Sequence, residues 1–236
     1  MHNTEVLDAV EHAIGLLILS RSRHPTDPKR WIHTVHVDGA LLMSSVSPLS
    51  ERELATMAIA AHGGPSLRVL VGGLGLGYTA QAALEEERTA LVRVVDRMDF
   101  VIKWLRDGRL PLSEQLNRDP RLEVVQSDVY ADLLGPADET WDLILIDVDH
   151  APDSPLDPTS LAFYTAQGQA AVRQHLTPGG ILAVWSAWDN DALAAVLDAS
   201  YAEAWREEIE WWTLPEADGG QLLHNVLFFG RKPQAG

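Results

Sequence analysis

The sequence contains no cysteine among its 236 residues, which excludes disulfide bridges, thiolate nucleophiles and cysteine-ligated zinc. Basic residues are also scarce: 18 lysines and arginines stand against 34 aspartates and glutamates, for a formal net charge of −16. So acidic a surface repels phosphate backbones and anionic lipid headgroups. We therefore expect neither nucleic acid nor a membrane as partner, and a small neutral or cationic molecule is favoured.

Long apolar runs are missing as well. The longest early run, residues 13–19, is too short to cross a bilayer, and the residues before it lack the basic flank of a signal peptide. These absences predict a cytoplasmic protein. With 46% hydrophobic residues, the chain can still form the core of one large domain, alone or with a small appendage.

The first part of the chain contains two local patterns. Apolar residues recur at helical spacing from Val6 onwards and predict an amphipathic helix over residues 4–20. Residues 31–43 predict a β-hairpin, because apolar side chains alternate by twos on both sides of the turn signal Asp38-Gly39. A small N-terminal unit of helix and hairpin is therefore expected.

A second helix is expected to join this unit to the rest of the chain. Ser50, with Glu53 three residues later, predicts its N-cap, and the apolar pattern continues to residue 61. We therefore divide the chain into an N-terminal segment, residues 1–64, and a larger domain, residues 65–236.

In the larger domain, short apolar runs alternate with helical patterns, which is typical of a mostly parallel α/β sheet with helices on both faces. Strands are predicted at residues 68–71, 91–96, 122–125, 143–147 and 181–185. The largest helix is predicted from about residue 158 to residue 176, before Pro178-Gly179-Gly180. Two antiparallel strands are predicted at residues 208–214 and 226–231, around a turn at 215–220.

A glycine-rich loop, VGGLGLGYT at residues 71–79, follows the first of these strands and opens a helix. Glycines at Gly73, Gly75 and Gly77 allow a tight turn and let a ligand approach the backbone. A P-loop needs Lys followed by Ser or Thr, and here Tyr78-Thr79 stands instead, which argues against a triphosphate site. A dinucleotide loop would need glycine instead of Tyr78.

Two acidic residues follow the next two strands. Asp96 ends its strand about 20 residues beyond the loop, where a carboxylate can accept hydrogen bonds from both ribose hydroxyls. Asp128 follows the third strand, where it or its neighbouring backbone can meet an adenine amino group. Because ligands of open α/β sheets bind at the carboxyl ends of the strands, the set predicts a nucleoside site. The alternative is that both carboxylates merely cap helices.

This ordered set resembles a class I S-adenosylmethionine-binding domain over residues 67–232, and the preceding hairpin resembles the spermidine synthase-like branch of that superfamily. The resemblance implies a Rossmann-like class I methyltransferase fold with strand order 3-2-1-4-5-7-6 and an antiparallel last strand. It implies S-adenosylmethionine or decarboxylated S-adenosylmethionine as cofactor. It also implies an N-terminal β-domain that often forms a subunit interface, from which we expect a homodimer.

Three ionisable residues, Asp147, Asp149 and His150, end the fourth strand, where a general base is expected. The resemblance implies that Asp147 helps deprotonate an attacking amine or anchors substrate beside the cofactor. His150 stands where aminopropyltransferases have a second Asp, and Asp149 would replace the lost charge. The alternative is that Asp147 orders the loop and His150 is simply exposed.

Two departures from the aminopropyltransferase pattern favour methyl transfer. In that family the glycine loop carries an Asp that contacts the aminopropyl amine, and here Gly75 occupies the position. The Tyr-His-Glu motif of the preceding helix is missing, since Arg52 and its neighbours stand near that place.

Aromatic residues beyond the catalytic segment are candidates for binding the acceptor. The resemblance implies that Tyr164 can wall the acceptor pocket, and Trp185 and Trp188 follow the fifth strand at the same edge. A cationic amine can bind in such an aromatic box. Core packing is the alternative for all three. No metal site is predicted, because His33 and His36 lack a suitably spaced carboxylate partner.

The first interpretation is an S-adenosylmethionine-dependent methyltransferase acting on a small molecule. The alternative is an aminopropyltransferase, such as a spermidine or polyamine synthase, that uses decarboxylated S-adenosylmethionine. A third hypothesis is a catalytically silent protein that keeps the nucleoside pocket. It would bind S-adenosylhomocysteine and be indifferent to Asp147→Asn.

Overall fold

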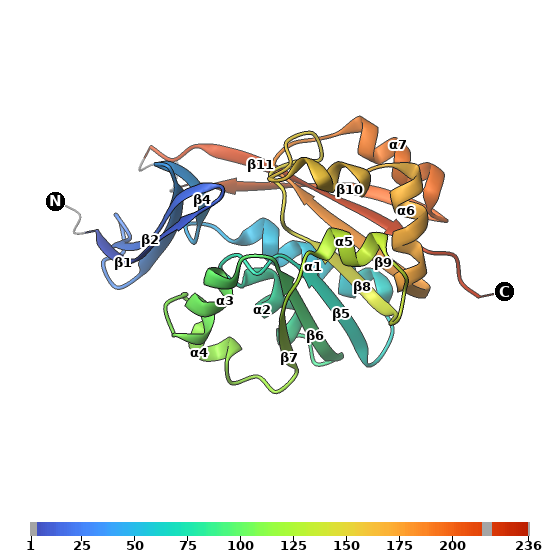
Figure 1. The fold of residues 1–236 in the computed structure, drawn as a ribbon, viewed down its shortest axis with the longest axis horizontal. Helices are drawn as coiled ribbons and strands as arrows, with labels where there is room; N and C mark the ends of the chain where they lie inside the picture. Colours follow the sequence, from blue (N-terminus) through green and yellow to red (C-terminus); the bar gives the residue numbers. More distant parts are fainter. Residues whose placement is uncertain (1–3, 214–218, 236) are drawn as a thin grey trace.

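Two β-sheets form the framework of the protein in a computed structural model that describes residues 4–213 and 219–235 (Figure 1). The smaller, antiparallel sheet contains, in order, β1 (Glu5–His12), β2 (Gly15–Arg23), β3 (Trp31–Val37) and β4 (Ala40–Ser44). It lies at one end of the molecule, beside the larger sheet and its helices (Figure 1).

The larger sheet has seven strands in the order β10-β11-β9-β8-β5-β6-β7. They are β5 (Leu67–Gly72), β6 (Thr89–Asp96), β7 (Leu122–Gln126), β8 (Trp141–Ile146), β9 (Leu176–Ser186), β10 (Glu203–Trp212) and β11 (Leu222–Arg231). Strand β11 runs antiparallel to both of its neighbours, and strands β5 to β9 pair in parallel. Numbered within the domain, this is the predicted order 3-2-1-4-5-7-6, which is confirmed.

Helices cover both faces of the larger sheet (Figure 1). On one face lie α1 (Leu49–His62), α2 (Tyr78–Glu85) and α3 (Asp99–Arg106), and on the other lie α5 (Val129–Leu134), α6 (Ala166–Val172) and α7 (Asp191–Ser200). The short helix α4 (Ser113–Leu116) and the 3₁₀ turns Pro158–Ala162 and Arg173–His175 lie in connections. Each helix described is too short or too polar to span a membrane.

Successive residues of each central strand enter different hydrophobic clusters. In β5, Val69 and Val71 pack on the side of α1 to α3, whereas Leu70 packs on the side of α5 to α7. Burial on both faces explains the continuous apolar runs of these strands. The strands consequently lie where the sequence predicts them, although their ends differ by a few residues. The last predicted pair also forms, as β10 and β11; residues 214–218, which include most of the predicted turn, lie outside the described residues.

The predicted helix over residues 4–20 is wrong, because this segment forms the hairpin of β1 and β2. Leu17 and Leu19 in β2 are fully buried and pair with β3, whereas Leu16 is 41% exposed. Alternation of buried and exposed side chains is typical of a strand, whose backbone hydrogen bonds are made with the neighbouring strands. This strand pairing overrides the helical spacing of the apolar residues. The hairpin of β3 and β4 confirms the other prediction, with positive φ at both turn residues.

The predicted helix over residues 158–176 is also wrong in its extent. The segment breaks into a 3₁₀ turn, α6, a second 3₁₀ turn and the start of β9. Thr165 caps α6 by accepting a hydrogen bond from the backbone N–H of Gly168, at 3.0 Å. Residues 178–180 lie within β9 rather than before it. Ser50 is not an N-cap either, since α1 begins at Leu49 and the Ser50 hydroxyl bonds to other side chains.

Replacing Leu17 with Ala tests the placement of β2. Its fully buried side chain packs in the cluster shared with α1 to α3, so Leu17→Ala should lower the free energy of unfolding by about 2–5 kcal/mol. Leu16→Ala, one residue earlier and exposed, should change it by less than about 0.5 kcal/mol. Urea unfolding monitored by circular dichroism measures both, and equal effects would contradict the strand assignment.

Candidate functional site

A pocket of about 880 Å³ opens at the carboxyl ends of the parallel strands. Its walls come from the glycine loop after β5, the ends of β6, β8 and β9, the first turn of α1, and strand β4 of the small sheet. The strand order reverses at β5, which places the pocket where ligands of open α/β sheets bind.

The glycine loop passes closest to β8 at Gly73. The φ angle of Gly73 is +91°, and a Cβ atom there would lie 2.2 Å from the carbonyl oxygen of Asp147. No side chain fits at such a distance. Gly75 and Gly77 also have positive φ angles and line the pocket, but a Cβ at Gly75 would meet only the sulfur of Met43, at 3.7 Å. The loop thus holds backbone directly against the strand that carries Asp147.

Asp96 and Asp128 line one side of the pocket, after β6 and β7. Asp96 accepts hydrogen bonds from the backbone N–H groups of Leu74 and Met98, both at 2.8 Å, so it helps order the glycine loop. Burial raises the pKa of its carboxyl group. Asp128 caps α5 by accepting from the backbone N–H groups of the next turn, at 3.0 and 3.2 Å. Helix capping therefore does apply to Asp128.

Arg97 is the only lysine or arginine among the described residues that line the pocket. Its guanidinium lies 2.8 Å from a carboxylate oxygen of Asp157 and 3.6 Å from one of Asp128. Its charge is thus already balanced on the side of the pocket formed by β6 and β7.

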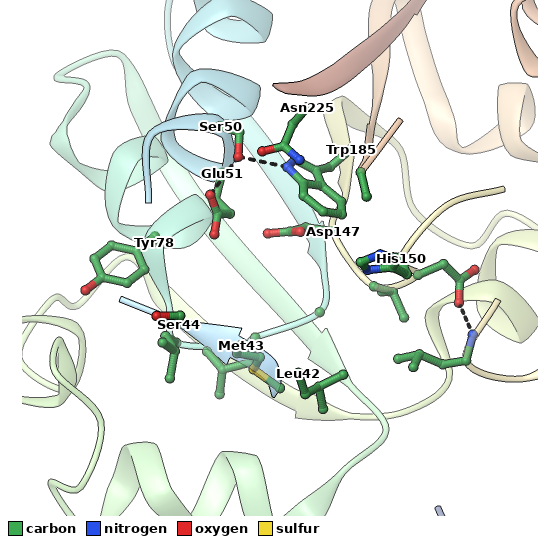
Figure 2. A pocket seen from close by; sticks show the side chains of 18 of the residues that line it. Leu42, Met43, Ser44, Ser50, Glu51, Tyr78, Asp147, His150, Trp185 and Asn225 are labelled. Atoms are coloured by element: carbon green, nitrogen blue, oxygen red, sulfur yellow. Dashed lines mark hydrogen bonds between the residues drawn. The ribbon is translucent and has the colours of Figure 1, made fainter. Parts of the chain in front are cut away.

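Glu51 and Asp147 face the same space from opposite walls (Figure 2). Burial raises the pKa of Asp147 to about 6, although the Thr79 hydroxyl donates to its carboxylate at 2.7 Å. Burial, and secondarily the charge of Asp147, raises the pKa of Glu51 to about 7. The pair can therefore take up or release a proton near neutral pH.

A short chain of hydrogen bonds holds Glu51 in place (Figure 2). The indole N–H of Trp185 donates to the Ser50 hydroxyl at 3.0 Å, and that hydroxyl donates to Glu51 at 2.9 Å. The sequence does not single out Glu51, because its segment has the pattern of a helix start and lacks the Tyr-His-Glu motif. Its signal was an acidic residue directly before Arg52, whose side chain turns away to pair with Glu85 on α2.

Asp149 lies in the loop that follows β8 and is buried, although part of its side chain lines the pocket. One carboxylate oxygen accepts from the hydroxyls of Tyr130, Tyr164 and Ser160 at 2.7, 2.9 and 3.0 Å, and the other accepts from the Leu156 backbone N–H at 2.8 Å. Burial raises the pKa values of both tyrosines, which keeps their hydroxyls protonated as donors. The observed contacts of Asp149 thus order the loop.

His150, Trp185 and Trp188 form an aromatic wall on the side of the pocket away from β6 and β7. The ring of His150 meets Trp188 edge-on at 5.0 Å between ring centres, and Trp185 at 6.4 Å. The indole N–H of Trp188 donates to Asp153 at 3.0 Å. This wall continues from Asp147 toward the pocket mouth.

The structure brings nearly all of the predicted site residues to this one pocket. They are Gly73, Gly75, Gly77, Asp96, Asp128, Asp147, Asp149, His150, Trp185 and Trp188. Tyr164 is not part of the lining; its hydroxyl donates to Asp149, and it packs against the core cluster on the side of α5 to α7, which is the alternative of core packing. Within residues 4–213 and 219–235, no group of three or more His, Asp or Glu side chains is placed to hold a metal ion.

Comparison with protein-family models found no match. A curated relative, polyamine aminopropyltransferase 2 of Streptomyces coelicolor, is 30% identical over 126 residues, which are 52% of this chain and 22% of that protein. The match thus spans about a fifth of the length of that relative.

Solved structures share the fold at low sequence identity. The spermidine synthase of Thermotoga maritima matches 98% of this chain and 74% of its own, with a TM-score of 0.71 and 17% identity. The N-methyltransferase NodS of Bradyrhizobium japonicum, in complex with S-adenosyl-L-homocysteine, matches 80% of this chain and 89% of its own, with a TM-score of 0.54 and 17% identity. The chain therefore has the Rossmann-like fold shared by spermidine synthases and methyltransferases.

Replacing Gly73 with Ala tests how tightly the loop packs on β8. The new Cβ would overlap the Asp147 carbonyl in a backbone conformation that alanine rarely adopts, so stability should fall by about 2 kcal/mol or more. Gly75→Ala, in the same loop but with open space around it, should cost only about 1 kcal/mol. Thermal unfolding compares the two variants, and a Gly73→Ala protein as stable as Gly75→Ala would refute this packing.

Proposed function

We propose that the protein transfers the aminopropyl group of decarboxylated S-adenosylmethionine to an amine. The observation that carries the proposal is the pair Glu51 and Asp147, which face each other across the pocket beside the glycine loop. Among the described residues that line the pocket, the only lysine or arginine is Arg97, which pairs with Asp157 and Asp128, so the two carboxylates favour a cationic ligand. The names of the curated relative and of the Thermotoga maritima structure support the same reaction.

The nucleoside would bind on the side of the pocket formed by β5, β6 and β7. The glycine loop offers backbone close to the ligand, and Asp96 keeps lone pairs for the ribose hydroxyls beyond those used by Leu74 and Met98. The segment around Asp128 would meet the adenine. S-adenosyl-L-homocysteine, the ligand of NodS, contains the same adenosine group, which supports this use of the fold.

The charge of the pocket separates the two possible donors. S-adenosylmethionine carries a carboxylate at the end of its side chain, whereas the decarboxylated form ends in an ammonium group alone. Two unit charges about 4 Å apart interact by about 4 kcal/mol at an effective dielectric constant of about 20. Near Glu51 and Asp147 this interaction is repulsive for the carboxylate and attractive for the ammonium, so the decarboxylated donor is favoured.

The transfer requires positioning and the removal of one proton. The lone pair of the acceptor amine attacks the methylene carbon of the aminopropyl chain that is bonded to the sulfonium sulfur, and this carbon–sulfur bond breaks with its electron pair going to sulfur. The products are methylthioadenosine and a substituted ammonium, whose proton passes to a carboxylate. We assign the role of proton acceptor to Asp147, which the Thr79 hydroxyl orients. Glu51 holds the ammonium group of the donor.

Methyl transfer, the first interpretation of the sequence, is the second candidate. Gly75 favours it, because the glycine loop itself contributes no acid to the pocket. Asp147 could equally accept a proton from a nucleophile that attacks the methyl group of S-adenosylmethionine. The donor that the pocket prefers therefore decides between the two reactions.

The homodimer and the cytoplasmic location expected from the sequence stay predictions. Exposed apolar residues on the small sheet, Val6 and Leu16, agree with a subunit interface there. Sedimentation velocity measures the oligomeric state directly.

Calorimetric titration with three ligands tests the proposed donor. Decarboxylated S-adenosylmethionine should bind at least about tenfold more tightly than S-adenosylmethionine, because only the latter brings a carboxylate near Glu51 and Asp147. Methylthioadenosine, which lacks both the carboxylate and the ammonium group, measures how much the nucleoside contributes to the affinity. Asp96→Ala should weaken the binding of all three ligands. Tighter binding of S-adenosylmethionine would instead assign the protein to methyl transfer.

The raised pKa values of Glu51 and Asp147 predict a loss of activity in acid. Both carboxylates must be ionised to hold cations and accept a proton, so kcat/KM should fall as the pH decreases through about 7 and 6. Glu51→Gln removes the group with the higher pKa, about 7, and leaves Asp147 with a pKa of about 6, so the acid limb should move to lower pH. Glu53→Gln, on the same helix but outside the pocket lining, is the matched control. Comparing variants with one acceptor cancels the titration of the amine, and identical acid limbs would exclude this role of Glu51.

A further inference from the structure

The part of the pocket left for the acceptor differs chemically from the part assigned to the nucleoside. Strands β6 and β7 carry Asp96 and Asp128, whereas β8, β9 and β11 lie on the other side of β5 in the sheet. That side contributes His150, Trp185, Trp188, Leu223 and Asn225 to the lining. If the proposed function holds, on which this inference rests, the acceptor lies against these residues.

Few carboxylates remain for a second cation on the acceptor. Six line the pocket among the described residues, namely Glu51, Asp96, Asp128, Asp147, Asp149 and Asp157. Asp96 and Asp128 bond to backbone N–H groups on the nucleoside side, and Asp157 pairs with Arg97. Asp149 is buried and accepts four hydrogen bonds. Glu51 and Asp147 each accept one side-chain hydrogen bond and are the least engaged of the six, and the donor ammonium and the reacting amine use both.

Carboxylates just outside the lining are also engaged. Asp153 accepts from the indole N–H of Trp188 at 3.0 Å, and Glu208 lies 2.6 Å from the ring nitrogen of His224. A second ammonium at the far end of the acceptor would therefore have to share a carboxylate that already bonds to the protein.

The mouth of the pocket is apolar instead. Leu41 is 59% exposed, Trp188 is 41% exposed, and Leu156 and Leu223 are each 37% exposed, yet all four line the pocket. They come from β4, β11 and the loops after β8 and β9, so they surround the opening from several sides. A gathering of exposed apolar side chains is uncommon on a chain with a net charge of −16 and marks a binding surface.

We propose that the acceptor is a primary amine with an aromatic or other apolar body in place of a second ammonium group. Its amine lies at Glu51 and Asp147, and its body lies between the His150–Trp185–Trp188 wall and Leu223. Trp rings accommodate flat apolar groups, and the leucines at the mouth lose their exposure when such a body covers them. The residues of the wall and mouth thus select the acceptor, while the two carboxylates serve the reaction.

A comparison of matched amines tests this inference. With decarboxylated S-adenosylmethionine as donor, kcat/KM for 2-phenylethylamine should exceed that for 1,4-diaminobutane by at least about tenfold, the discrimination that one buried apolar group provides. Hexylamine, with no ring and one charge, should also exceed the diamine. A preference for the diamine, for example with its far ammonium over a Trp face, would overturn the proposal.

Two neighbouring leucines of β11 provide a matched pair of variants. Leu223 lines the pocket and Leu222 does not, although their exposed fractions are 37% and 38%. Leu223→Glu places a carboxylate at the mouth and should shift the selectivity toward 1,4-diaminobutane by about tenfold or more. Leu222→Glu should leave the ratio of the two kcat/KM values unchanged. Equal ratios in both variants would argue against a body seated at Leu223.

Binding without reaction separates this inference from the proposed function. Each amine is titrated into the protein saturated with methylthioadenosine, with tryptophan fluorescence as readout. Tighter binding of 2-phenylethylamine without any transfer would sustain the acceptor site and overturn the aminopropyl reaction. Transfer that prefers 1,4-diaminobutane would sustain the reaction and overturn the acceptor site. Neither binding nor transfer with any of the amines would overturn both.

Discussion

Two carboxylates that face each other in a partly buried pocket are the constraint on which the rest of the site depends. Each side chain of the pair, Glu51 and Asp147, receives a hydrogen bond from a neutral hydroxyl, not from a cation. Hydroxyl donors fix the position of a carboxylate but leave its charge uncompensated. The electrostatic cost of the two ionised carboxylates falls when a positive charge lies between them.

The fold meets this constraint by joining parts of the chain that are distant in sequence. Helix α1 precedes the parallel sheet, yet its first turn is tied to β9 through the bond from Trp185 to Ser50. The same helix packs on the cluster shared with α2, α3 and the small sheet. A rigid scaffold on both sides of the pair keeps the two carboxylates from relaxing apart or turning to solvent.

The sequence predicted those features of the structure that residues close together in the chain determine. The parallel strands and the glycine loop were predictable, because apolar runs and glycines specify them within a few residues, whereas the strand order followed only from the resemblance to S-adenosylmethionine-binding domains. The helix predicted over residues 4–20 failed because pairing between β2 and β3 decides that segment. Glu51 was missed, and for Tyr164 the choice between pocket wall and core stayed open, for a related reason: their contacts, with Asp147 and Asp149, depend on how separate elements meet.

Two glycines of the loop, Gly73 and Gly75, differ in how much room a side chain would have. Gly73 cannot carry a side chain, because the carbonyl of Asp147 fills its space, whereas Gly75 opens toward the pocket with only Met43 near. Its φ of +51° is also one that aspartate and asparagine tolerate. One substitution could add a charge beside the donor without repacking anything else. Gly75 is therefore the position of this loop at which a side chain could change the charge of the pocket while the fold stays unchanged.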